Sequence, residues 1–208
     1  MWDKEIKFVN DLFIKNNNCL KDFKQAFRRR DEHTSRVLKL AMNIVNSLDK
    51  DRKKFLDIDA ISLTCIFHDV GIDNVDFRQS HGYRSSQIFE SYAKENNFDP
   101  KLIEKVSSMI LVHEDKSLLK SNISEELKIV IEANWLDEEG VLGITRDLLT
   151  IGENAESYKD VVRYIEENSL NRIDIPNPMD HEYARVEWEK KRKFVKSYLK
   201  EYKKELYL

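Results

Sequence analysis

One stretch sets the architecture of this chain: residues 58–71 read IDAISLTCIFHDVG. Its first ten residues are apolar on nearly every side of a helix, which predicts a central buried helix. His68 and Asp69 follow directly, and Gly71 lets the chain turn away. A carboxylate buried beside an imidazole is costly unless a cation or charge-assisted hydrogen bonds compensate it. A divalent metal takes both side chains as ligands, so the His-Asp pair points to a metal site.

The composition around this stretch is that of a helical protein. The 208 residues include only 5 glycines and 3 prolines, too few for a turn-rich β-protein. Apolar residues recur with helical spacing, and the 35% of charged residues suit the outer faces of amphipathic helices, so we predict an all-α fold. Gly71, Gly140 and Gly143 are interpreted as helix stops. The helices are expected over residues 2–16, 19–29, 32–48, 58–70, 82–96, 100–114, 125–138, 156–167 and 180–206.

Charge and cysteine content limit the expected partners and compartment. The 35 Lys and Arg nearly balance 38 Asp and Glu, and the formal net charge of -3 gives no general reason to expect nucleic acid or an anionic membrane. Cys19 and Cys65 cannot build a disulfide framework in a chain of this size, so a cytoplasmic location is expected. The charged N-terminus and the lack of an 18-residue apolar run predict neither a signal peptide nor a membrane span.

The C-terminal part is expected to stand apart from the rest. Residues 171–178 contain two of the three prolines, so we predict a helical bundle over residues 1–170 and a linker with a helix over residues 171–208. That long helix is amphipathic, with Trp188 and Leu199 on its apolar stripe and lysines around it. It is expected to pack on the bundle or on a partner subunit of a homodimer. Contact with nucleic acid or a membrane surface is the alternative.

Several histidines fall at inward positions of the expected helices. His33 lies on the apolar face of the helix over residues 32–48, in line with Val37. His113 continues the inward face of the helix over residues 100–114. A lone histidine on an apolar face is more often a hydrogen-bonded core residue than a ligand. Together with the His-Asp pair, however, these inward positions favour a shared site.

Five short segments carry a known pattern. They are HTSRV at 33–37, FHDVG at 67–71, HGYRS at 81–85, ILVH at 110–113 and GVLGITR at 140–146. In their content and order the sequence resembles the HD superfamily of metal-dependent phosphohydrolases, and most closely its small stand-alone members. The resemblance covers residues 33–146. It implies an all-α HD-domain helical bundle in which His33, His68 and Asp69 hold a divalent metal.

The chain departs from the family pattern at the last ligand. The family usually reads Asp-Ala-Asp-x-Leu-Asp there, whereas residues 132–137 read EANWLD. By alignment Asn134 occupies the usual ligand position, and an amide oxygen can coordinate a hard cation but supplies no charge. Asp137, one turn later, is the nearest carboxylate that could replace it. We favour Asp137 as the direct ligand, with Asn134 as the alternative; a third interpretation is that Asp137 only fixes the turn at Gly140 by hydrogen bonding.

The resemblance implies further roles around the metal. His81 and His113 would bind either a second metal ion or the substrate phosphate, and structural histidines are the alternative. Arg36, Arg84 and Arg146 are candidate catalytic and substrate-binding residues that would neutralise phosphate oxygens; each is otherwise a surface arginine. Mixed oxygen and imidazole ligands suit Mn, Mg, Fe, Co or Ni, and manganese is our preferred choice.

The implied function is a phosphohydrolase in which a metal-activated water at His68 and Asp69 cleaves phosphate ester or anhydride bonds. The expected partner is a small phosphorylated molecule, namely a nucleotide. Asn134 suggests an alternative, a non-catalytic or attenuated HD domain that binds a nucleotide or nucleic acid. The extra histidines suggest another, a di-iron oxygenase of HD type. The run of arginines at residues 28–30 is interpreted as a solvated face, or as positive potential beside an anion site.

Overall fold

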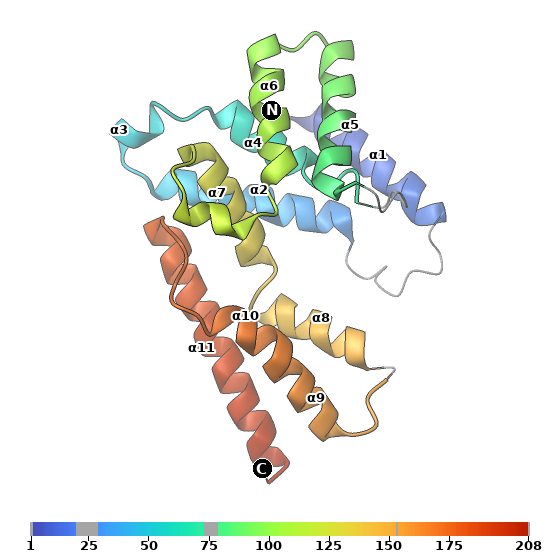
Figure 1. The fold of residues 1–208 in the computed structure, drawn as a ribbon, viewed down its shortest axis with the longest axis vertical. Coiled ribbons are helices and arrows are strands. Elements are labelled where there is room, and N and C mark those ends of the chain that lie inside the picture. Colours follow the sequence, from blue (N-terminus) through green and yellow to red (C-terminus); the bar gives the residue numbers. More distant parts are fainter. Residues whose placement is uncertain (1, 20–28, 73–78, 153, 208) are drawn as a thin grey trace. The chain divides into compact units, whose positions relative to one another are not determined.

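The fold is that of a computed structural model, which describes residues 2–19, 29–72, 79–152 and 154–207. Within these ranges all regular structure is helical and there is no strand, which confirms the all-α fold (Figure 1). The helix predicted over residues 19–29 lies outside the described residues apart from its two ends, as does Arg28. No helix in the described ranges has an apolar stretch long enough to cross a membrane.

The chain divides into two compact units, Met1–Asn134 and Trp135–Leu208, and each is described by itself. Helix α7 begins in the first unit, and its last three residues belong to the second. In chain order the elements that begin in the first unit are α1 (Asp3–Cys19), α2 (Arg30–Ser47), α3 (Lys50–Lys53), α4 (Ile58–Phe67), α5 (His81–Glu95), α6 (Pro100–Val112), the 3-10 helix η2 (Lys116–Lys120) and α7 (Glu125–Asp137).

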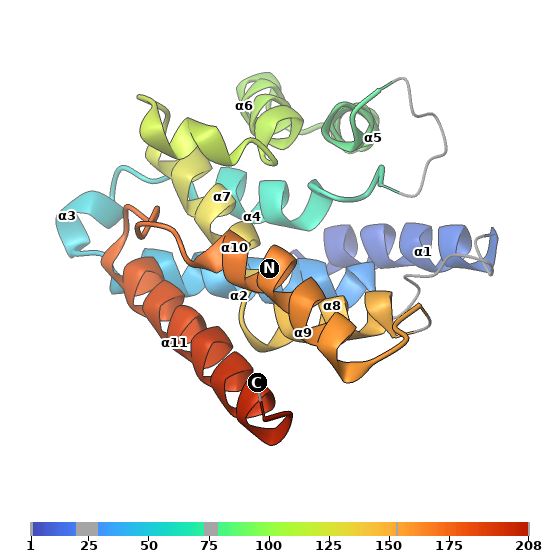
Figure 2. The same cartoon turned by 60° about the horizontal axis from the view of Figure 1, so that its bottom comes forward.

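Helix α4 is the centre of the first unit, as the sequence predicts. Eight of its ten residues are buried, and it packs against α1, α2, α5 and α6. Figure 2 shows it between α2 and the adjacent pair α5 and α6. Asp57 begins the helix by accepting a hydrogen bond from the N–H of Ala60 at 2.9 Å. Because α4 is buried along its length, the residues that follow it, His68 and Asp69, lie in the interior.

Aromatic rings pack around the last turn of α4. Phe67 is fully buried, and its ring lies 5.1 Å from that of Phe89 and 5.3 Å from that of Tyr92. The Phe8 ring of α1 lies 6.1 Å from the Phe67 ring. Such a cluster fixes the helix end through its large buried area and its edge-to-face ring contacts. It therefore holds the backbone immediately before His68.

The helices predicted from residues 100 and 125 begin with side-chain caps. Asp99 accepts hydrogen bonds from the N–H groups of Lys101 and Leu102, and Pro100 is the first residue of α6. Ser124 Oγ accepts from the N–H of Leu127 at 3.2 Å in the first turn of α7. These caps are local signals, which is why the sequence predicts them.

The second unit contains the predicted C-terminal amphipathic helix. Its elements after the end of α7 are α8 (Val141–Ile151), α9 (Tyr158–Ile165), the π-helix η3 (Glu166–Leu170), α10 (Asn171–Ile173) and α11 (Glu182–Glu205). In α11 the buried side includes Trp188, whose ring lies 5.1 Å from that of Trp135 at an angle of 74°. The domain boundary that we predict at residue 170 stays a prediction.

The structure contains a helix, α8, that the sequence does not predict, because Gly140 and Gly143 near its start are interpreted as helix stops. That interpretation is wrong for Gly143, which lies inside the first turn of α8. A Cβ there would come 2.8 Å from the carbonyl oxygen of Glu138, so only glycine allows this close approach. Gly140, with a φ of 78°, supplies the left-handed backbone immediately before the helix. The two glycines therefore begin a helix here.

Candidate metal centre

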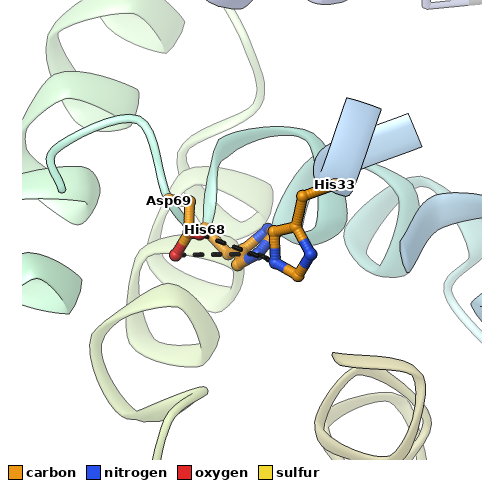
Figure 3. Close-up of side chains that lie close together, drawn as sticks. All are labelled: His33, His68 and Asp69. Atoms are coloured by element: carbon orange, nitrogen blue, oxygen red, sulfur yellow. Dashed lines mark hydrogen bonds and ion pairs between the residues drawn. The ribbon is translucent and has the colours of Figure 1, made fainter. Parts of the chain in front are cut away.

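The three residues of the first predicted ligand set meet in space. His33 comes from the first turn of α2, and His68 and Asp69 come from the end of α4 (Figure 3). The two imidazole Nε2 atoms lie 3.2 Å apart. Asp69 Oδ2 lies 3.6 Å from Nε2 of His33, and Asp69 Oδ1 lies 3.7 Å from Nε2 of His68. All three side chains are buried. The arrangement presents two nitrogens and a carboxylate to one point.

A second group shares the same carboxylate. His81, at the start of α5, has its Nε2 3.2 Å from Asp69 Oδ1, and His113, directly after α6, has its Nε2 3.7 Å from the same oxygen. The Nε2 atoms of these two histidines are 3.3 Å apart. Asp69 is thus common to two sets of ligand atoms, each within 4.8 Å of one another. Four imidazoles converge on one carboxylate.

Glycine makes this convergence sterically feasible at the end of the His-Asp segment. A Cβ on Gly71 would lie 2.6 Å from the backbone nitrogen of Ser85, so the loop touches α5 directly. The Gly71 N–H donates to Ser85 Oγ at 2.9 Å, which fixes the contact. His81 lies one turn before Ser85. The same contact therefore holds His81 beside Asp69.

A second glycine brings α5 against α6. A Cβ on Gly82 would lie 2.7 Å from the carbonyl oxygen of Leu111 and 3.0 Å from that of Ile110. Any other residue would push the two helices apart. Because Gly82 follows His81 and Leu111 lies two residues before His113, this close approach sets the spacing of the two imidazoles.

The outer nitrogens of three imidazoles are occupied by oxygen acceptors. Nδ1 of His68 lies 2.8 Å from the Cys65 carbonyl, and Nδ1 of His113 lies 2.6 Å from the Ile110 carbonyl. These are carbonyls of the last turns of α4 and α6, which lack a partner within their helices. Nδ1 of His81 lies 3.1 Å from Glu114 Oε1. With the proton on Nδ1, each Nε2 offers its lone pair inward, as metal-binding histidines do.

The electrostatics of the His68-Asp69 pair also favour the ligand states, whereas, despite burial, contact with Asp69 raises the pKa of His113 above its usual value. Burial lowers the pKa of His68 to about 3, so its imidazole is neutral near pH 7. Burial alone would raise the pKa of Asp69, but hydrogen bonds and positive charge from its surroundings hold it well below its usual value. The side chains responsible, in order of effect, are His68, His113, His81 and Arg30. Neutral imidazole and ionised carboxylate are the forms that bind a metal.

The candidates for the last ligand are both buried. Asn134 is 7% exposed, and its Oδ1 has no hydrogen-bond partner among the described residues. An orphaned buried amide oxygen is rare, and a cation is one of the few partners that would satisfy it. Asp137 is 5% exposed and belongs to the second unit, so its part in the site stays a prediction. The two nitrogen-oxygen groups by themselves fit a divalent ion, and Asn134, like Asp137, stays a predicted ligand.

The predicted arginines have other partners in the structure. Arg84 donates through Nε to the Gly71 carbonyl at 2.8 Å and through Nη1 to the Gln79 carbonyl, so it links these two residues to α5. Arg36 lies 4.0 Å from Glu32 and is 40% exposed. Arg146 belongs to the second unit, where its Nε lies 3.8 Å from Asp147. Their part in holding a phosphate stays a prediction.

The structure adds two contacts beside the histidines. The sequence gives the run of arginines at residues 28–30 only a general role, as a solvated face or as positive potential beside an anion site, and it gives Glu114 no role. Arg30, the first residue of α2, donates from Nη1 to Asp69 Oδ2 at 3.1 Å. Glu114 contacts His81, as described above. Arg30 lies three residues before His33 and hence on the same helix face, a signal that could have identified it. No local signal in the sequence directs Glu114 toward His81.

Comparison with known proteins identifies the class to which this fold and site belong. The HD domain family matches residues 30–139, just over half of the chain. The chain therefore belongs to the HD domain family. Both histidine-carboxylate groups lie within the matched residues.

Solved structures share the fold along most of the chain. An HD-superfamily hydrolase from Bacillus thuringiensis gives a TM-score of 0.65 at 18% identity, over 97% of this chain and 98% of that chain. A predicted HD-superfamily hydrolase from an uncultured Thermotogales bacterium gives a TM-score of 0.63 at 19% identity, over 96% of this chain and 92% of that chain. YpgQ of Bacillus subtilis in complex with ADP gives a TM-score of 0.57 at 21% identity, over 84% of this chain and 88% of that chain. At such identities the likeness shows the fold alone. No curated protein matches the chain.

Proposed function

We propose that this protein is a metal-dependent phosphohydrolase that cleaves phosphate ester or anhydride bonds of a small, nucleotide-like molecule. The observation that carries the proposal is the convergence of four imidazole Nε2 atoms on the buried carboxylate of Asp69. A cluster of imidazole nitrogens around one ionised carboxylate, buried in an all-α domain, is suited to a cation. Without a cation it would be a costly way to bury polar groups.

The first ion would be held by His33, His68 and Oδ2 of Asp69. We favour Asp137 as the remaining protein ligand and keep Asn134 as the alternative, which its unsatisfied Oδ1 supports. Manganese is the preferred metal, with Mg, Fe, Co and Ni as alternatives, because no feature of a mixed nitrogen and oxygen site selects strongly among them. A bound divalent ion would lower the pKa of a water molecule and polarise a phosphoryl oxygen.

The second group, with Oδ1 of Asp69, would hold a second ion. The matching orientation of His81 and His113, each with its Nδ1 directed away from the carboxylate, supports this assignment. The alternative is that these two imidazoles contact the substrate phosphate. In either case Glu114 would be a positioning residue, because it contacts His81 and not the reacting atoms.

The chain's own cations would hold the phosphate oxygens. Arg36, Arg84 and Arg146 are proposed in that role, since a guanidinium matches phosphate oxygens with paired donors. Arg84 already donates a hydrogen bond to the Gly71 carbonyl, so it would both hold a phosphate oxygen and link Gly71 to α5. The complex of YpgQ with ADP supports a nucleotide as the substrate of this chain.

One observation favours a second candidate function. An amide at position 134, where the family usually has a carboxylate, would weaken a metal site. An attenuated HD domain that binds a nucleotide or nucleic acid without turnover is therefore the alternative. A di-iron oxygenase is the third possibility, and it requires two irons per chain and consumption of oxygen.

The decisive experiment combines metal analysis with an activity panel. Elemental analysis of purified wild-type protein and of Asp69→Ala should show metal in the first and its loss in the second. The matched control is Asp59→Ala, which removes an exposed carboxylate from the other end of the same segment and should leave metal content unchanged. With added Mn²⁺, wild type should release phosphate or pyrophosphate from a nucleotide panel. Binding without turnover would favour the attenuated domain, and equal metal in all three proteins would refute the site.

A further inference from the structure

Arg30 lies beside Asp69, the carboxylate that both ligand groups share. Its side chain is only 16% exposed, and its Nη1 donates to Asp69 Oδ2 at 3.1 Å. The same oxygen lies 3.6 Å from Nε2 of His33, so it belongs to the first ligand group. A guanidinium has five N–H groups, and the described residues use one of them through this contact. A metal ion bound by Asp69 Oδ2 would thus have the positively charged guanidinium of Arg30 as its immediate neighbour.

Counted over the buried side chains, which leaves out Glu114 with its 47% exposed side chain, the charges of the group do not balance without an anion. The imidazoles are neutral when they bind metal, and Asp69 supplies a single negative charge that Arg30 already offsets. With one divalent ion, the buried centre would carry about two positive charges if Asn134 completes it and about one if Asp137 does. A second ion would add about two more. Uncompensated charge is costly in the interior, so a multiply charged anion would be stabilised here.

We propose that Arg30 binds the phosphate group of the substrate and makes metal binding and phosphate binding mutually dependent. This inference rests on the metal centre of the proposed function. A metal ion and the guanidinium both use Oδ2 of Asp69, so each weakens the other's hold on it. A phosphate that bridges the two cations removes the repulsion and takes up the N–H groups of Arg30 in paired hydrogen bonds. By linkage, phosphate then tightens metal binding by the same factor as metal tightens phosphate binding.

The neighbouring Arg29 provides a matched control. It carries the same charge and lies one residue earlier, but its guanidinium pairs with Asp31 at 2.6 Å and its side chain is 54% exposed. Removing the charge of Arg29 changes the net charge of the segment as much as removing that of Arg30. A difference between the two variants therefore reports on the contact with Asp69 and not on general electrostatic attraction.

The test is calorimetric titration of Mn²⁺ into the full chain, with and without inorganic phosphate, for wild type, R30Q, R30M and R29Q. In wild type and R29Q, phosphate should lower the Mn²⁺ dissociation constant by about tenfold, a usual size for such coupling. In R30Q, Mn²⁺ should bind about tenfold more tightly without phosphate, and the gain on adding phosphate should fall below about threefold. R30M keeps the apolar stem of the side chain and repeats the test if R30Q folds poorly.

The outcomes separate this inference from the proposed function. Wild-type binding of Mn²⁺ that Asp69→Ala abolishes would support the metal centre whatever Arg30 does. The role of Arg30 is refuted if phosphate increases the Mn²⁺ affinity of R30Q and R30M as much as that of wild type. It is also refuted if R29Q loses this increase to the same extent as the Arg30 variants. Phosphate without effect on wild-type Mn²⁺ affinity would refute it as well. If wild type binds no more Mn²⁺ than Asp69→Ala does, the metal centre fails and the inference fails with it.

Discussion

Glu126→Gln tests the packing of the first unit through its pH dependence. Glu126, in the first turn of α7, is 8% exposed, and its Oε1 accepts from Lys105 Nζ of α6 at 2.8 Å and from the N–H of Asp57 at 3.3 Å. This one carboxylate therefore joins α7, α6 and the start of α4. A charge-assisted hydrogen bond contributes about 1.5–3 kcal/mol. Because the Lys105 side chain is 36% exposed, screening reduces the expected loss to about 1–2 kcal/mol at pH 7.

The pH dependence of this loss follows from the direction of the pKa shift. Burial alone would raise the pKa of Glu126, but the hydrogen bond from Lys105 and backbone N–H donors hold it below its ordinary value of 4.5. A carboxylate with a lowered folded-state pKa stabilises the fold fully above its unfolded-state pKa, and this stability is lost as the pH falls through the folded-state pKa. The difference between wild type and Glu126→Gln should therefore be largest above about pH 5 and shrink steadily toward pH 3.

The assay is urea unfolding followed by far-ultraviolet circular dichroism at several pH values between 3 and 7. Glu104→Gln is the control, because Glu104 is an exposed carboxylate on α6, the same helix that carries Lys105. It should change the free energy of unfolding by less than about 0.5 kcal/mol at every pH. An equal loss for Glu126→Gln at pH 3 and pH 7 would falsify the ion-pair explanation. So would an equal pH-dependent loss in the control.

Three further substitutions test the core and the site. Phe67→Ala should lower the free energy of unfolding by about 3–5 kcal/mol, because it empties the aromatic cluster at the end of α4; a thermal melt like that of wild type contradicts this packing. Glu114→Gln should weaken binding of the second metal ion by roughly tenfold, because it alters the contact that orients His81; unchanged calorimetric affinity removes Glu114 from the site. Asn134→Asp should tighten Mn²⁺ binding and increase hydrolysis, since it adds a charged ligand; no change in either measurement points to Asp137.

The elements that the sequence predicts well are those with local signals. The apolar run of α4 indicates burial by itself, and Asp99 followed by Pro100 marks a helix start whatever surrounds it. Helix α8 was missed for the opposite reason. Gly143 is required by its approach to the Glu138 carbonyl, and a glycine needed for close packing looks the same in a sequence as one that ends a helix.

The candidate site divides in the same way. The histidines and Asp69 could be proposed from residue type, inward spacing and family pattern. Their partners are harder to propose. The position of Arg30 three residues before His33 suggests only that the two share a helix face, and its contact with Asp69, like that of Glu114 with His81, depends on packing between different helices. Arg84 shows the same limit: its hydrogen bond to the Gly71 carbonyl is a structural contact that no spacing rule reveals, and its part in phosphate binding stays a prediction.

Two features of this chain change the charge of the centre in the same direction. Asn134 stands where the family usually has an aspartate, which removes a negative charge, and Arg30 adds a positive charge at Asp69. Each feature would weaken the retention of a divalent ion, the first by removing a charged ligand unless Asp137 replaces it, the second by repulsion. Together they would make a multiply charged anion a favourable part of the complete site. If that anion is the substrate phosphate, the loss of one protein ligand is offset only while substrate is bound, and metal affinity then becomes a measure of substrate occupancy.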